Sequence, residues 1–138
     1  MKKILFIFSL LLISCSEDLS QKAKDFSQNK IIIDSHIDTP FQIWRQKNNT
    51  GASDDITKST SFHFDYPRAV KGGLNLPFFA IFIPARTEPE GTSFDLAVEL
   101  INMMNEIISN NPDKFTFIKN PSDTVSYTHL TLPTMDHV

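Results

Sequence analysis

The chain has 138 residues, of which 41% are hydrophobic and 21% are charged, and its formal net charge is −3 at pH 7. These values fit a single globular unit of modest size. The sequence contains no cluster of basic residues, which argues against nucleic-acid binding. Its single cysteine excludes an intrachain disulfide.

The first residues predict a targeting segment. Lys2 and Lys3 form a basic start, and the apolar stretch from Ile4 to Ile13 is short for a membrane span. The stretch ends in Leu12-Ile13-Ser14-Cys15, which resembles the lipobox of bacterial lipoproteins. The resemblance implies a signal peptide at 1–14 and a lipid on Cys15. It also implies a lipid-anchored protein of the bacterial cell envelope that faces the periplasm or the cell surface. An ordinary secretory signal with an incidental cysteine is the alternative.

Residues 15–29 are polar and charged, and we expect them to form a tether between the lipid and the folded domain. The three consecutive isoleucines at 31–33 then predict a buried strand, because branched Cβ atoms favour extended backbone. An unbroken apolar run is typical of a parallel strand that is covered on both faces. Pro40 lacks a backbone N–H group, so the strand should end there.

His36 and Asp38 lie two residues apart at the end of this strand. Side chains at i and i+2 of a strand point to the same side, so the imidazole and the carboxylate can converge on one metal ion. A hydrogen-bonded structural pair is the alternative. The position favours the metal, because barrel enzymes carry catalytic groups at the carboxyl ends of their strands. We interpret Asp34 as a structural group rather than a ligand.

Further elements follow in order. We expect a short helix at 41–45 with Thr39 as its cap, a surface loop at 46–61, and a helical turn that starts at Pro67 and stops at Gly72-Gly73. The proline-bounded apolar run at 76–84 predicts a second strand. We interpret His63 as a loop residue and Arg68 as a structural residue that neutralises nearby carboxylates.

Residues 93–110 give the clearest helical pattern. Apolar side chains recur at three- and four-residue spacing, and the predicted buried stripe consists of Phe94, Ala97, Val98, Ile101, Met104 and Ile108, widened by Leu100 and Ile107. Residues 115–118 predict a short third strand. The succession of strand, helix and strand indicates a parallel α/β architecture.

Two of these motifs together resemble the zinc-dependent membrane (renal-type) dipeptidase family. The first is Ile33-Asp34-Ser35-His36-Ile37-Asp38-Thr39-Pro40, which is similar to the Asp-x-His-x-Asp entry strand of that family. The second is Pro67-Arg68-Ala69-Val70-Lys71-Gly72-Gly73 leading into the apolar run at 78–84, where the family has a Pro-Arg-Leu-x-x-Gly-Gly turn. The order and spacing of the motifs agree from about residue 30 to residue 123.

The resemblance implies that residues 30–124 are the N-terminal part of a TIM-like (β/α) barrel of the metal-dependent hydrolase type. It implies two zinc ions in the intact enzyme, with His36 and Asp38 as ligands of one, and dipeptides as substrates hydrolysed by zinc-activated water. No catalytic residue beyond these ligands is assigned. The intact enzyme could also be an oligomer.

Residues 125–134, Val-Ser-Tyr-Thr-His-Leu-Thr-Leu-Pro-Thr, resemble a translated sequencing adapter. We therefore interpret 125–138 as an artefact, which removes His129 and His137 from the candidate ligands. A genuine strand rich in hydroxyl groups is the alternative. If the natural chain continues past residue 124, the remaining ligands lie in the lost part, and the fragment itself should be inactive.

Two other functions stay open. The first is a surface lipoprotein that binds a ligand or partner without catalysis, which the lipobox and the incomplete set of ligands favour. The second is another metal-dependent hydrolase with a His-x-Asp first strand, such as a deacetylase or lactonase relative. The Pro-Arg and Gly-Gly turn argues against that second alternative.

Overall fold

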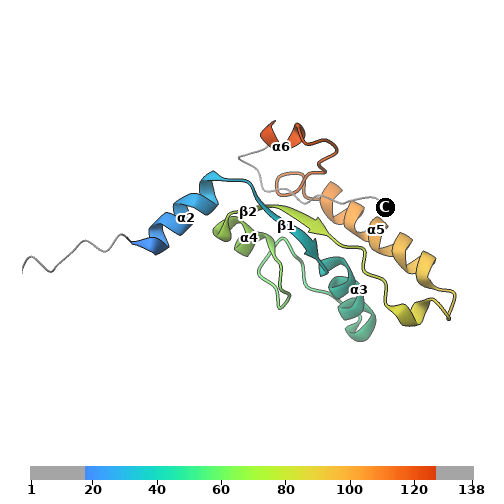
Figure 1. Ribbon diagram of the computed structural model, residues 1–138. Helices are drawn as coiled ribbons and strands as arrows, with labels where there is room; N and C mark the ends of the chain where they lie inside the picture. The colour runs from blue at the N-terminus through green and yellow to red at the C-terminus, as the bar shows by residue number, and fades with distance from the viewer. Residues whose placement is uncertain (1–17, 127–138) are drawn as a thin grey trace, which may run out of the picture.

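The computed structural model describes residues 18–126 of the chain (Figure 1). The predicted signal peptide, Cys15, His129 and His137 lie outside this range. The described part is a mixed α/β structure with one small sheet. In chain order its elements are α2 (Leu19–Asn29), β1 (Ile32–Ile37), α3 (Thr39–Thr50), α4 (Tyr66–Gly72), β2 (Leu74–Phe79), the 3₁₀ turn η1 (Ala85–Thr87), α5 (Ser93–Ser109) and α6 (Asp123–Ser126).

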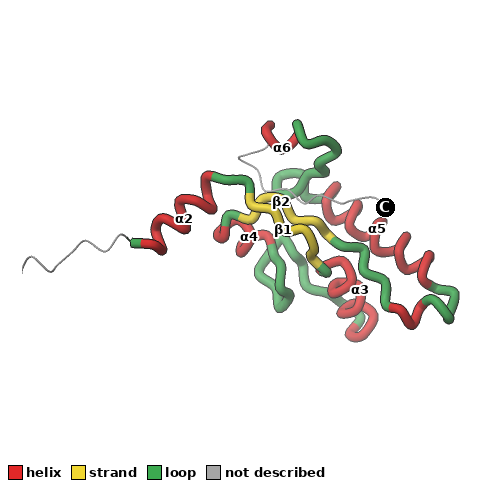
Figure 2. The backbone as a smooth tube through the Cα atoms, viewed as in Figure 1, coloured by secondary structure: helices red, strands yellow, loops and turns green. Residues whose placement is uncertain are grey.

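The two strands β1 and β2 run parallel and side by side (Figure 2). Ile32 pairs with Leu74 at one end and Ile37 with Phe79 at the other, and the chain crosses between them through α3 and α4. This order agrees with the parallel architecture that the sequence predicts. The expected cover on both faces of β1 is wrong for the described residues, because most of the strand is exposed and Ile33 keeps 56% of its surface.

Helix α3 is longer than the five residues expected for it. Its N-cap is Asp38 rather than Thr39, and Pro40 lies in the first turn, where its missing N–H group costs no hydrogen bond. The helix ends at Thr50 and is capped by Gly51. The φ of Gly51 is 82°, which is left-handed, and its N–H donates to the Lys47 carbonyl at 2.8 Å. The polar residues 46–50 are therefore helical, and the surface loop starts only after them.

Helix α4 begins at a buried carboxylate. The side chain of Asp65 is 0% exposed and accepts hydrogen bonds from the backbone N–H groups of Thr60 at 3.0 Å and Arg68 at 2.9 Å. Arg68 Nε donates to the same carboxylate at 2.7 Å, and its guanidinium also reaches the Phe62 carbonyl. The interpretation of Arg68 as a structural residue that neutralises a carboxylate is confirmed.

The core forms where α5 packs across the sheet and α3. The buried residues of α5 form a single ridge at four-residue spacing. They are Leu96, Leu100, Met104 and Ile108. The wider predicted stripe is only partly right, because Phe94 is 77% exposed and Val98 is 39% exposed. A sheet of two strands and one neighbouring helix offer too little surface to cover all the apolar positions of α5.

Two further strand predictions need correction. β2 starts at Leu74 and ends at Phe79, so residues 80–84 leave the sheet, although the Ala80 N–H still donates to the Ile37 carbonyl at 3.0 Å. Residues 115–118 form no strand, and Phe115 is instead buried in the core with its ring edge-on to Tyr66. The segment expected as a tether also differs, since it is helical from Leu19 to Asn29.

The close approach of α2 to the end of α4 predicts a large effect of Gly73→Ala. Gly73 has a φ of 79°, and a Cβ there would lie 2.3 Å from the Ser27 carbonyl oxygen. Gly51 has a similar φ of 82° but open space around it, so Gly51→Ala is a matched control. We expect Gly51→Ala to lower the free energy of unfolding by about 1 kcal/mol from backbone strain. Gly73→Ala should cost roughly a further 1–3 kcal/mol from overlap. Denaturant unfolding measures both, and equal losses would contradict the contact.

The Asp65 carboxylate predicts that acid destabilises the fold. Burial raises the pKa of Asp65, but the N–H donors of Thr60 and Arg68 and the Arg68 guanidinium lower it more, and the net pKa lies below its ordinary value of 3.8. Because the folded pKa is depressed, the stabilisation is present above that value and is lost as the pH falls through the folded pKa. Asp65→Asn should therefore have a lower free energy of unfolding than the unsubstituted chain at pH 7. The difference between the two free energies should narrow towards pH 2.

Asp113→Asn is the control for this prediction. Asp113 pairs with Lys114 at the surface, so its replacement should have little effect at pH 7. If the free energies of unfolding of the unsubstituted chain and of Asp65→Asn differ by the same amount at every pH, the role given to the charge of Asp65 is wrong.

Candidate metal site

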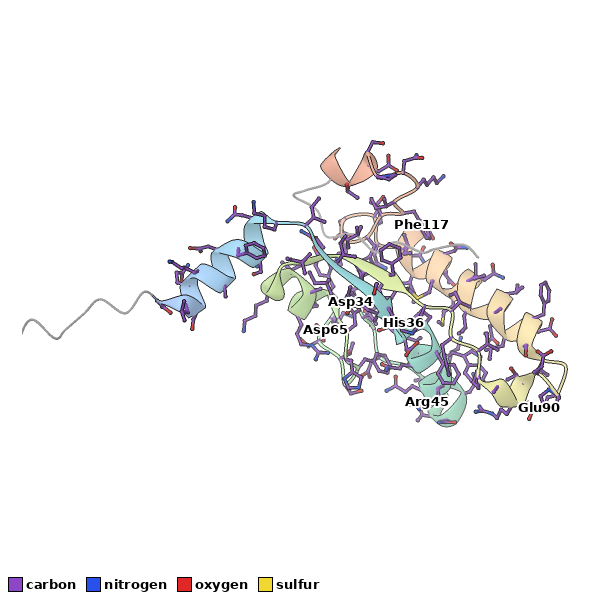
Figure 3. The ribbon with its side chains drawn as sticks, viewed as in Figure 1. Asp34, His36, Arg45, Asp65, Glu90 and Phe117 are labelled. Atoms are coloured by element: carbon purple, nitrogen blue, oxygen red, sulfur yellow. The ribbon has the colours of Figure 1, made fainter. Side chains whose placement is uncertain are left out.

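His36 lies near the carboxyl end of β1, where the strand passes into α3 (Figure 3). Asp38 follows directly after the strand. His36 Nε2 lies 3.0 Å from Asp38 Oδ1. Both side chains remain open to solvent, with 64% and 42% of their surfaces exposed. The structure therefore brings the two predicted ligands together on one side of the chain, at an accessible position.

The backbone around the pair is held by local hydrogen bonds. Asp34 Oδ1 accepts from the His36 N–H at 3.0 Å, and the Asp38 carbonyl accepts from the Gln42 N–H at 3.1 Å as α3 begins. Asp34 thus supports the strand end on which the imidazole sits, which agrees with its interpretation as a structural residue. The turn from strand to helix fixes Asp38 at the N-cap of α3, two residues after the histidine.

The donor atoms of the pair fit part of a metal site. An imidazole nitrogen and a carboxylate oxygen are both zinc ligands, and here the two atoms lie 3.0 Å apart. Zinc in proteins takes four ligands. Between residues 18 and 126, no group of three or more His, Cys, Asp or Glu side chains comes together to hold a metal ion. The described residues therefore bring together two candidate ligands, fewer than such a site needs.

A polar pocket that the sequence analysis missed lies beside α3. It has a volume of about 320 Å³ and is lined by one polar face of the helix, Gln42, Arg45, Gln46 and Asn49, together with Thr50 and the loop Ser61, Phe62 and His63. His63 is a loop residue, as predicted, and it lines this pocket. The sequence did not predict the pocket because residues 46–50 were expected to form a loop. Gln42, Gln46 and Asn49 lie on one face only if the helix extends through these residues.

The loop that closes this pocket is held by Asp54. The Ser61 N–H donates to Asp54 Oδ2 at 2.9 Å and the Ser61 hydroxyl at 2.8 Å. These two bonds lower the pKa of Asp54, so the carboxylate stays ionised at neutral pH. The Asp54 N–H in turn donates to Gln46 Oε1 at 2.6 Å, which ties the loop to α3.

Comparison with known proteins identifies the family. The family model described as membrane dipeptidase (Peptidase family M19) matches residues 20–131, which is most of the chain. The chain belongs to this family of dipeptidase-type hydrolases. No curated protein matches the chain. Within 18–126, no helix is both long and apolar enough to cross a membrane.

Proposed function

We propose that the chain is the N-terminal part of a zinc-dependent dipeptidase whose TIM-like barrel begins with β1. The observation that carries the proposal is the exposed His36–Asp38 pair at the carboxyl end of β1, in a chain of the membrane dipeptidase family. Catalytic groups of barrel enzymes lie at this end of the strands. The parallel pairing of β1 with β2 and the crossover through α3 and α4 are compatible with the first unit of such a barrel.

The two side chains would hold one of two zinc ions through His36 Nε2 and Asp38 Oδ1. Zinc held there would supply Lewis acidity, which would polarise a peptide carbonyl and lower the pKa of water towards neutrality. The contribution of this chain is to position the ligands: the strand end and the cap of α3 fix both side chains, and Asp34 holds the His36 backbone. The exposure of the pair leaves room for a substrate beside it.

The substrate proposed for the intact enzyme is a dipeptide, including dipeptides with a D-residue on the C-terminal side. Hydrolysis adds water across the peptide bond: the carbonyl carbon gains the hydroxyl oxygen, the C–N bond breaks, and the leaving nitrogen takes a proton. An oligomeric state is compatible with this proposal.

We further propose that Cys15 carries a lipid and anchors the protein in the bacterial cell envelope, facing the periplasm or the cell surface. The support is the sequence Leu12-Ile13-Ser14-Cys15 after a basic start and an apolar stretch. Anchoring by lipid alone requires no membrane-spanning helix in the folded domain.

The proposed ligands predict site-specific zinc binding. Titration of the 138-residue chain with Zn²⁺ should shift the imidazole NMR signals of His36, and His36→Ala or Asp38→Ala should abolish the site. The binding should be weak, because two ligands provide only half of a zinc coordination sphere. His63→Ala is the matched control and should leave the site intact. If excess zinc does not move the His36 signals, the metal proposal is wrong and a non-catalytic lipoprotein becomes the better interpretation.

The incomplete ligand set also predicts that this polypeptide does not turn over substrate. We expect the purified 138-residue chain to release no amino acids from dipeptides in the presence of zinc, because the described residues bring two ligands together rather than a binuclear set. Chromatographic detection of free amino acids measures this directly. Zinc-dependent release that His36→Ala removes would show that the described residues suffice for activity.

A further inference from the structure

Helix α2 carries an apolar stripe that the described part of the chain leaves open to solvent. Leu19, Ala23 and Phe26 follow one another at four- and three-residue spacing, so they share one face of the helix. Leu19 is 73% exposed and Phe26 is 60% exposed. Figure 1 shows α2 extending away from the sheet and the remaining helices.

The opposite face of α2 is polar and is fixed to the domain. Gln28 Nε2 donates to the carbonyl oxygens of Val70 at 3.2 Å and Lys71 at 3.1 Å, at the end of α4. On the same polar face, Gln21 Nε2 donates to Asp25 Oδ1 at 2.7 Å. The backbone of Ser27 packs directly on Gly73. These contacts hold α2 in a defined orientation, with the apolar stripe facing outward.

The start of α2 lies close to the proposed lipid. Asp18 caps the helix by accepting from the Ser20 N–H at 3.0 Å, and only Ser16 and Glu17 separate it from Cys15. Four residues of fully extended chain span at most about 14 Å, so Leu19 cannot lie further than that from the backbone of Cys15. This step rests on the lipid anchor proposed above.

We propose that α2 lies flat in the membrane interface, with Leu19, Ala23 and Phe26 inserted at the boundary between headgroups and acyl chains. The occupant of the apolar stripe is thus a phospholipid surface. An amphipathic helix of this kind buries its apolar face about 5–10 Å below the headgroups. The lipid and the helix together would fix the domain at two points.

This arrangement would separate the candidate metal site from the membrane-bound helix. α2 joins β1 at the amino end of the strand, whereas His36 and Asp38 lie at the carboxyl end. A six-residue strand is about 20 Å long. The pair would therefore lie at the end of β1 that is remote from the membrane-bound helix.

A tryptophan at position 26 tests the proposal. Trp44 is the single native tryptophan, so Phe26→Trp in a Trp44→Phe background gives one fluorescent reporter. The 138-residue sequence is expressed in a bacterium that processes lipoproteins. The purified product is reconstituted in phosphatidylethanolamine–phosphatidylglycerol vesicles with and without brominated acyl chains. We expect a blue-shifted emission that brominated lipid quenches. The matched control is Phe94→Trp in the same background, which reports from an exposed site at the start of α5 and should stay unquenched.

Two further variants and one measurement make the outcomes distinct. Leu19→Gln should reduce the quenching of the Phe26→Trp reporter, whereas Lys24→Gln, on the polar face, should leave it unchanged. Mass spectrometry of the purified chain reports whether Cys15 carries a lipid, which tests the anchor separately. A lipidated chain whose reporter is unquenched, either water-exposed or shielded by protein contacts, would overturn the proposal for α2 while leaving the anchor and the dipeptidase proposal standing.

Discussion

The buried carboxylate of Asp65 is the interaction on which the arrangement of the two strands depends. It accepts from the Thr60 N–H, and so holds the end of the surface loop, and from the Arg68 N–H, and so starts α4. A buried carboxylate is costly unless it is paired and hydrogen-bonded, and the Arg68 guanidinium supplies both compensations. The short helix that follows ends at Gly72 and is capped by Gly73, directly before β2 begins. The Pro-Arg turn is thus a device for aligning the second strand with the first.

Burial in the described structure differs between the two strands, because β2 is largely covered whereas β1 is largely exposed. Phe64 and Phe79 meet edge to face with ring centroids 5.0 Å apart, and Met104 of α5 is fully buried with them in one cluster. By contrast, Ile33 of β1 is 56% exposed and Phe82, just after β2, is 42% exposed. Exposed apolar side chains next to an uncovered strand favour association with other chains. The cluster that includes Met104 therefore covers the end of β2, whereas β1 and the segment after β2 keep apolar side chains exposed.

The sequence predicted those features that depend on neighbouring residues along the chain. The positions of β1, α4 and α5 follow from an isoleucine run, a proline–glycine boundary and helical spacing. The sequence-based predictions were wrong where contacts between residues far apart in the chain determine the structure. Which apolar residues of α5 are buried depends on the small sheet and on α3, and favours Leu96 and Leu100 over Phe94 and Val98. Phe115 matched a strand pattern, but its ring packs against Tyr66 and the segment has no strand partner in 18–126.

The difference between local and long-range contacts also explains how far the candidate site could be predicted from the sequence. His36 and Asp38 were found because their proximity follows from the two-residue repeat of a strand, and their 3.0 Å separation needs no distant residue to create it. Further ligands of a metal site come from elements far apart in the sequence, and no local spacing reveals them. The pocket beside α3 is an intermediate case, since one wall is a helical face and the other is the loop that Asp54 holds in place. A local pattern can thus identify two candidate ligands, whereas the chemistry of a complete site depends on long-range packing.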